Sequence, residues 1–335
     1  MATSTVSVIC WPSWRKPTDA VLTSPICRLL GIDYPVFQGA MAWISDADLA
    51  AAVSNAGGLG IIASGSAPVD IVRTQVRRCR GLTDRPFAVN IMLMSPAAAD
   101  IAQMVIDEGV SVITTGAGSP AKYMAAWLAA GIKVIPVIPS AGIAKAVERV
   151  GAVAVVAEGG ESGGHVGDLT TMALVPQVVD AVELPVLAAG GIGDGRGLAA
   201  ALMLGAVGVQ MGTRFLVARE CNVHPAYKQK ILAAKDIDTI ATGKRLGHPV
   251  RGLKNAFSRR FFEMEYDPTV SNEALEKFGE GALQKAAIAG DVDNGAIMAG
   301  QIAGLVQAEQ TAADIITETV SQAEVLLRGA PAWIA

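Results

Sequence analysis

Charged residues are scarce in this chain of 335 residues, at 17%, and neither sign is in large excess. The 27 Lys and Arg residues against 31 Asp and Glu residues leave a net charge of −4, so the chain lacks the basic surface of a nucleic-acid-binding protein. Hydrophobic residues make up 51% of the chain, whereas disordered chains combine low hydrophobicity with high net charge. The composition therefore indicates a folded protein with a large apolar core.

Long hydrophobic runs and clustered cysteines are also missing. The longest uncharged stretch, residues 49–69, is interrupted by Ser, Asn, Gly and Pro, whereas a membrane-spanning helix needs a mainly apolar run. Residues 1–24 lack the apolar centre of a signal peptide, so we expect an N-terminal extension there. The four cysteines are widely spaced without a CxxC pair, which argues against a structural zinc site or a disulfide framework. We therefore expect a cytoplasmic protein that does not bind membranes.

A repeating pattern occupies the first two thirds of the chain. Eight apolar runs of strand length occur at residues 35–39, 59–63, 87–93, 110–115, 133–138, 152–157, 185–189 and 207–211. Stretches with helical spacing lie between them, among others at 46–55, 69–80, 97–108, 121–130 and 143–150. Apolar runs that alternate with helices predict a parallel α/β fold, and eight such units indicate a TIM (β/α)8 barrel. A doubly wound sheet usually has fewer strands.

The repeat stops after the eighth run, and this break predicts the domain organisation. Residues 25–218 form the barrel in this interpretation. Residues 219–265 are more polar and basic, so we expect a small lid, inserted after strand eight, that lies over the strand ends. Residues 266–335 show helical patterning at 274–283, 296–307 and 311–327, and we expect C-terminal helices that pack on the barrel. The alternative is a separate small domain attached by a linker.

Glycine gathers where the predicted strands seven and eight end. Gly190 and Gly191 follow strand seven, and Gly212 and Thr213 follow strand eight. Bare backbone lets amide groups approach a phosphate, a following helix N-terminus adds its dipole, and these two loops commonly bind phosphate in such barrels. Tight turns would explain any one of these glycines, but the two loops together favour a phosphate site. The glycine spacing in residues 190–195 does not fit the GxGxxG dinucleotide motif.

A glycine-rich segment, residues 157–167, follows strand six and contains His165. Its five glycines make it costly to order without a ligand, and histidine exchanges protons near neutral pH. His165 is therefore a candidate catalytic residue, with a structural histidine as the alternative. Ser162 formally completes a GxSxG pattern but lies several residues beyond the strand, unlike a nucleophile elbow. No metal-ligand spacing links His165 to its acidic neighbours, so we expect a cofactor to carry the chemistry.

Several motifs carry a resemblance to a known family. The glycine–histidine segment, residues 188–192 (AAGGI) and residues 209–215 (VQMGTRF) are together similar to the superfamily of FMN-dependent nitronate monooxygenases and enoyl-acyl carrier protein reductases II. A more specific similarity to the flavin-dependent reductase branch occurs at residues 114–118, 222–228, 236–239, 290–293 and 299–305. Glu158 also agrees with the reductases, because monooxygenases often have glutamine there. The similarity extends from about residue 25 onward.

The resemblance implies a TIM barrel with FMN across the carboxyl ends of its strands. The FMN phosphate is expected at Gly190, Gly191, Gly212 and Thr213, and the flavin ring at Gly39, Ala40 and Met41. The implied binding site is completed by Asn90, Glu158, Gly163, Gly164, Gln210 and Met211. A homodimer and a bound monovalent cation are further expectations from the family.

The implied activity is reduction of trans-2-enoyl-acyl carrier protein to acyl-acyl carrier protein in fatty acid biosynthesis. Hydride would pass from NADH or NADPH to FMN and then to the enoyl β-carbon, with His165 as donor to the developing enolate. Lys228, Arg251 and Lys254 are candidates to receive the carrier protein or nicotinamide phosphates, with a solvated face as the alternative. The alternative activity is nitronate monooxygenase, in which FMN and O₂ oxidise nitronates. A third possibility is a phosphate-ligand-binding barrel without redox activity.

Overall fold

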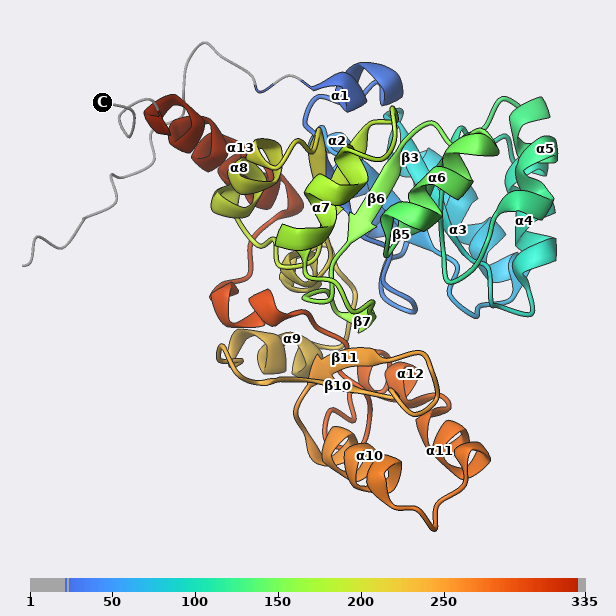
Figure 1. The fold of residues 1–335 in the computed structure, drawn as a ribbon, viewed down its shortest axis with the longest axis vertical. Helices are drawn as coiled ribbons and strands as arrows, with labels where there is room; N and C mark the ends of the chain where they lie inside the picture. The colour runs from blue at the N-terminus through green and yellow to red at the C-terminus, as the bar shows by residue number, and fades with distance from the viewer. Residues whose placement is uncertain (1–21, 23, 331–335) are drawn as a thin grey trace, which may run out of the picture.

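The computed structural model of the protein describes residue 22 and residues 24–330 (Figure 1). The N-terminal extension expected over residues 1–24 therefore lies outside the described residues, except for Leu22 and Ser24. The Ser24 hydroxyl accepts the amide hydrogen of Ile26 at the start of α1 (Pro25–Leu30). The Leu22 amide donates to the carboxylate of Glu324 at 2.6 Å. The described chain thus begins beside its own C-terminal part.

Eight parallel strands form a nearly closed barrel (Figure 1). They are β1 (Val36–Gln38), β2 (Gly60–Ala63), β3 (Phe87–Met92), β4 (Val112–Gly116), β5 (Lys133–Ile138), β6 (Val155–Glu158), β8 (Val186–Ala189) and β9 (Gly208–Met211). They pair in the order β1-β9-β8-β6-β5-β4-β3-β2. An isolated parallel bridge between Phe37 and Leu59 joins the two ends of this order. Each predicted run overlaps one strand, and the TIM barrel is confirmed.

Helices surround the barrel and connect its strands. They are α2 (Ala47–Asn55), α3 (Val69–Leu82), α4 (Ala98–Asp107), α5 (Ala121–Ala129), α6 (Ala141–Arg149), α7 (Thr171–Val179) and α8 (Gly195–Met203). Side-chain caps define several starts: Asp46 accepts amide hydrogens at the start of α2, and Ser140 does so at the start of α6. The five helices expected from their spacing begin and end within two residues of the observed ones.

The strands are apolar on both faces because each face is covered. Ile61 of β2 and Val156 of β6 belong to an inner cluster with Phe37. Their sequence neighbours Ile62 and Val155 point the other way and pack in the clusters beneath the helices. This burial on two sides explains why the strands appear in the sequence as continuous apolar runs.

A second body, the cap (residues 219–309), follows the 3₁₀ helix η1 (Thr213–Val217) and lies below the barrel in Figure 1. It contains α9 (Pro225–Leu232), the strands β10 (Thr239–Thr242) and β11 (Val250–Leu253), and the helices α10 (Ala256–Tyr266), α11 (Asn272–Gly279) and α12 (Ala282–Ala287). The cap extends beyond residue 265, the boundary expected from the sequence, because α11 packs on α10 and α10 packs on β10.

The cap contacts the barrel at several places, among them the glycine-rich segment and Thr213. β11 pairs antiparallel with β7 (Gly164–His165), a short strand within the glycine-rich segment. Ala218 forms a parallel bridge with Gln310, so the chain enters and leaves the cap at neighbouring points. The inserted region therefore lies over the carboxyl ends of the barrel strands, and the glycine-rich segment is part of its sheet.

Two stretches differ from the helices expected in them. Residues 274–283 are divided between α11 and α12, because Gly281 has a φ of 69° in the left-handed region. Residues 296–307 contain no α-helix in the described structure. They instead form a bridge between Met298 and Gly252 and then the 3₁₀ helix η2 (Gln301–Leu305). A Cβ on Gly300 would lie 2.7 Å from the Glu161 carbonyl oxygen, so this path depends on a close backbone approach.

The helix expected over residues 311–327 is α13 (Ala312–Gly329), which packs against α8 and α2 (Figure 1). Gly195 at the start of α8 permits this contact, because a Cβ there would lie 2.3 Å from the Cβ of Gln322. Among the described residues, only α13 of the C-terminal helices makes this contact with the barrel helices; α11 and α12 belong to the cap.

The cysteines of the described part are buried and unpaired. They are Cys27, Cys79 and Cys221. Burial raises the pKa of Cys79 to about 12 and that of Cys221 to about 11, so both thiols are protonated at neutral pH. None of the described helices is long and apolar enough to cross a membrane.

Gly60 provides a test of how closely the helices pack on the barrel. A Cβ at Gly60 would lie 1.8 Å from the carbonyl oxygen of Ala50 in α2, and this backbone atom cannot move aside cheaply. We expect Gly60→Ala to lower the free energy of unfolding by about 3 kcal/mol or more, measured by chemical denaturation. Gly81 in α3 is the matched control, because nothing lies within 4 Å of a Cβ there. Equal losses in the two variants would contradict this account.

Candidate active site

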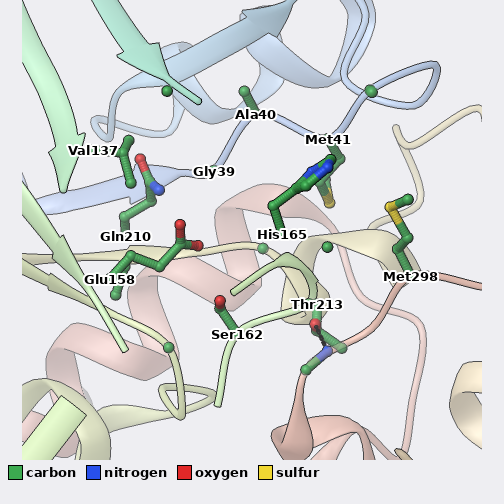
Figure 2. Close-up of a pocket in the computed structure, with 18 of the residues that line it drawn as sticks. Gly39, Ala40, Met41, Val137, Glu158, Ser162, His165, Gln210, Thr213 and Met298 are labelled. Atoms are coloured by element: carbon green, nitrogen blue, oxygen red, sulfur yellow. Dashed lines mark hydrogen bonds between the residues drawn. The ribbon is translucent and has the colours of Figure 1, made fainter. Parts of the chain in front are cut away.

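A cavity of about 240 Å³ lies at the carboxyl ends of the barrel strands (Figure 2). The residues that were predicted from the sequence and that line it are Gly39, Ala40, Met41, Asn90, Glu158, Gly163, Gly164, His165, Gly190, Gly191, Gln210, Gly212 and Thr213. Met211 does not line it, because its side chain is buried in the core. Its carbonyl oxygen instead accepts the Gly39 amide hydrogen at 2.8 Å.

Buried polar side chains hold residues 39–41 at the edge of the cavity. The Ser45 hydroxyl accepts the Met41 amide hydrogen at 2.9 Å and lies 2.9 Å from the Gln38 side-chain nitrogen. The side-chain oxygen of Gln38, Oε1, accepts the amide hydrogen of Ile61 at 3.1 Å. Gln38 is fully buried and was not predicted as part of the site. Its only sequence signal is a polar residue inside an apolar run.

The predicted phosphate loops present backbone rather than side chains to the cavity. Gly190 and Gly191 have φ values of 90° and 71°, which favour glycine. A Cβ on Gly190 would also lie 2.7 Å from the carbonyl oxygen of Gly159. Neither Lys nor Arg occurs among the described residues that line the cavity. An anion in this cradle would therefore be bound by backbone amides and the Thr213 hydroxyl.

The first turn of α8 contributes less to this cradle than the sequence predicted. The Gly195 amide donates to the Gln322 side chain at 3.1 Å, and the Arg196 amide donates to the Asp194 carboxylate at 2.9 Å. These two amides of the helix N-terminus are thus already satisfied within the protein. Thr213 differs, because its oxygen accepts the Gly300 amide hydrogen at 2.8 Å while its own hydrogen has no acceptor among the described residues.

Three polar side chains from different strands face the cavity. The Asn90 amide donates to the Thr114 hydroxyl at 3.0 Å, and its oxygen remains available. The Gln210 side chain forms no hydrogen bond with a described residue and packs over Gly39. Glu158 at the end of β6 points its carboxyl group into the cavity (Figure 2). Burial raises the pKa of Glu158 to about 7, against the opposing effect of the Ser162 hydroxyl.

The glycine-rich segment is ordered by the cap. Gly164 pairs with Arg251 and His165 pairs with Val250, and the Val166 amide donates to the Pro249 carbonyl oxygen at 3.0 Å. On the other side, a Cβ on Gly163 would lie 2.6 Å from the carbonyl carbon of Ala299. The loop was expected to need a ligand for its order, whereas protein contacts on both sides already hold it.

His165 lies at the boundary between barrel and cap. Its side chain is exposed to the cavity and, in Figure 2, points towards Met41. Surrounding protein atoms and the neighbouring His248 lower the pKa of His165, with burial as the larger cause. The two imidazole centroids are 6.3 Å apart in an edge-to-face arrangement. His165 is therefore a neutral imidazole at pH 7, able to donate one hydrogen bond and accept another.

The two polar residues that precede the glycine pair have different environments. The Glu161 carboxylate accepts the Thr171 amide hydrogen at 2.9 Å and thereby caps α7. The Ser162 hydroxyl is buried and forms no hydrogen bond of normal geometry with a described residue. Since Ser162 is not on a strand-to-helix turn, a nucleophile elbow is absent at this position. No cluster of three or more His, Cys, Asp or Glu among the described residues is arranged to hold a metal ion.

The basic residues proposed as a docking face have mainly structural contacts. Lys228 is buried, and its ammonium group donates to the Ala218 carbonyl oxygen at 2.7 Å. The Arg251 guanidinium donates to the carbonyl oxygen of Gly160 at 2.9 Å. Lys254 alone of the three is exposed. Lys228 is thus enclosed by protein and Arg251 is half-buried with its guanidinium bound to backbone, which the sequence does not reveal.

A segment after α12 closes the cavity and was not assigned a role from the sequence. Met298, Gly300 and Ile302 line the cavity. The Met298 carbonyl oxygen accepts the hydroxyl hydrogen of Tyr227 at 2.9 Å. The sequence predicts a helix over residues 296–307 and a motif of the resemblance at 299–305, but no site residue there. Their position depends on the fold of the cap, so no local pattern could place them.

Known proteins match this chain over both the barrel and the cap. The family model described as nitronate monooxygenase matches residues 23–107 and 102–322. A solved structure of FabK from Thermotoga maritima has a TM-score of 0.91 and 46% identity, and the match covers 93% of this chain and 99% of that one. Nitronate monooxygenase of Pseudomonas aeruginosa is 35% identical over 352 residues, which cover 90% of this chain and 99% of that protein.

A further relative carries a different name. The (3aS,4S,5R,7aS)-5-hydroxy-7a-methyl-1-oxo-octahydro-1H-indene-4-carboxyl-CoA dehydrogenase of Mycobacterium tuberculosis is 42% identical over 236 residues. The match covers 70% of this chain and 66% of that protein, just under two thirds of its length. The relatives thus share the fold but differ in the reactions for which they are named.

Glu158 provides a pH test of the site. Its pKa is about 7 in the folded protein against 4.5 for an ordinary glutamate, so between these values the folded state binds the extra proton. Protonation of Glu158 therefore stabilises the folded state fully below pH 4.5, and this contribution is lost as the pH rises through about 7. We expect the Tm of Glu158→Gln minus the Tm of wild type to increase by several degrees from pH 5 to pH 8. The measurement is a series of thermal melts of cofactor-free protein. A difference in Tm that does not change with pH would contradict the raised pKa.

Proposed function

The chain belongs to the nitronate monooxygenase family, and we propose that it is an FMN-dependent oxidoreductase that reduces trans-2-enoyl-acyl carrier protein to acyl-acyl carrier protein. The observation that carries this proposal is the match to FabK, an enoyl-acyl carrier protein reductase, over the barrel and the cap together. The M. tuberculosis relative supports it, because its name also denotes an acyl thioester as substrate.

The residues at the barrel mouth fit FMN. The bare backbone of Gly190, Gly191 and Gly212 and the free hydrogen of Thr213 suit a phosphate. The unpaired amide of Gln210 and the oxygen of Asn90 offer partners for a polar ring edge. The chemistry that FMN supplies when bound is hydride transfer between NAD(P)H and the β-carbon of the enoyl thioester.

His165 and Glu158 are the titratable side chains suited to the proton transfers. Negative charge develops on the thioester oxygen during reduction, and the α-carbon must gain a proton. The neutral imidazole of His165 donates a hydrogen bond to that oxygen in our proposal. Its pairing with Val250 of the cap keeps the ring at the cavity wall. Glu158, with a pKa of about 7, supplies a second exchangeable proton inside the cavity.

Nitronate monooxygenase is the second candidate function. It is favoured by the name of the matching family model and by the relative from P. aeruginosa, which is matched over 99% of its length. With a neutral nitroalkane as substrate, His165, whose lowered pKa keeps it unprotonated at neutral pH, would take the proton from the carbon that bears the nitro group and so generate the nitronate. Enoyl-dependent NAD(P)H consumption supports the reductase, whereas nitronate-dependent O₂ uptake without NAD(P)H supports the monooxygenase.

Replacement of His165 tests the proposed role. We expect His165→Ala to lower the rate of enoyl thioester reduction by roughly 10²–10⁴-fold, because the developing oxyanion loses its donor. Bound flavin, measured by the visible spectrum, should be retained, since His165 does not belong to the phosphate cradle. His165→Gln, which keeps a side-chain donor, should recover part of the rate. An unchanged rate in His165→Ala would refute the assignment.

A further inference from the structure

The cap contains a second cavity, the cap chamber, with a volume of about 650 Å³. It lies between the hairpin β10–β11 and the helices α10 and α11, and its apolar lining includes Ile240, Leu246, Val250, Leu253, Phe261 and Leu275. Pockets that bind small molecules have volumes of about 300–1,000 Å³. The chamber is thus large enough for a ligand in its own right.

The cap chamber adjoins the candidate active site. His165 and Met298 line both cavities, and they are the only described residues to do so. Val250, which lines the chamber, is the strand partner of His165, and Met298 forms a bridge with Gly252 of β11. The two cavities are therefore neighbours that share His165 and Met298 in their walls.

The polar groups of the α10 wall are satisfied within the protein. The Asn255 side chain donates to the carbonyl oxygens of Val292 and Gly295, both at 2.7 Å, and accepts the Ser258 amide hydrogen at 2.8 Å. The Ser258 hydroxyl accepts the backbone amide hydrogen of Asn255 at 2.9 Å. Among the described hairpin residues that line the chamber, Thr242 and His248 have polar side chains. These walls offer few partners for polar atoms, so they suit a hydrocarbon.

The charged lining residues are confined to α11 and the residue after it. They are Glu273, Glu276, Lys277 and Glu280, and all are exposed. The chamber therefore has an apolar interior, one end at His165 and a charged outer side. The apolar interior between these two ends suits a hydrocarbon chain.

We propose that the cap chamber binds the hydrocarbon tail of the acyl thioester substrate and thereby sets the chain-length preference of the enzyme. This inference rests on the proposed reduction of enoyl thioesters. The reacting carbons lie at His165, and the rest of the acyl chain extends into the chamber past Met298. Each methylene buried there should raise affinity by about fourfold, equivalent to ~0.8 kcal/mol, until the chamber is filled.

The test measures binding of saturated thioesters to the flavin-containing protein by calorimetry, so that it does not depend on turnover. The probes are butanoyl- and decanoyl-N-acetylcysteamine. We expect decanoyl to bind wild type at least a hundredfold more tightly than butanoyl. Ile240→Trp places a larger side chain in the chamber and should reduce that ratio at least tenfold. Ile237→Trp is the matched control, because Ile237 precedes the same hairpin but is exposed and does not line the chamber.

Two outcomes would overturn the proposal: equal affinities for the two probes in wild type, or equal ratios in Ile240→Trp and Ile237→Trp. If Ile240→Trp does not fold, judged by circular dichroism, Leu246→Trp narrows the chamber from the hairpin loop instead. Enoyl reduction is then assayed separately. Chain-length-dependent binding without any enoyl reduction would support the role of the chamber in binding the tail but refute the proposed function. Enoyl reduction without a binding preference would refute only the role of the chamber.

Discussion

The backbone pairing between Gly164–His165 and Val250–Arg251 is the interaction on which the candidate site depends. A segment with five glycines loses much conformational entropy when it is ordered. The cap hairpin holds this segment on one side, and residues 298–302 pack against it on the other. His165 thus faces the barrel mouth because of contacts made outside the barrel. Barrel and cap are therefore both parts of one site, although only the barrel carries the predicted cofactor residues.

The sequence predicted the barrel well and the cap poorly, for a physical reason. Strands such as β2 and β6 are buried on both faces, so their apolar runs stand out between amphipathic helices. The cap strands are short and half-exposed, and β7 has two residues, so neither leaves a periodic signal. Residues 296–307 have helical spacing, yet close approach at Gly300 selects another conformation. Such tertiary contacts overrule local preference.

In the site, too, local features were predictable from the sequence and tertiary features were not. Glycines at strand ends and the histidine among them are local features, and they converge on one cavity. Burial is not local: Met211 and Lys228 look available in the sequence, but the core encloses both side chains. Gln38 and Met298 were missed because their roles come from neighbours distant in the chain. Residue type at a strand end thus predicted which positions line the cavity, whereas the orientation of each side chain required the structure.

The neighbouring entry and exit of the cap have a consequence for how this fold varies. Ala218 and Gln310 lie side by side, so the chain returns to the barrel close to where it left. An insertion with adjacent ends can be lengthened, shortened or replaced without moving the strands beneath it. Evolution can therefore change the half of the site that meets the substrate while the half with the glycine loops is inherited unchanged. One barrel could in this way give rise to enzymes with different names.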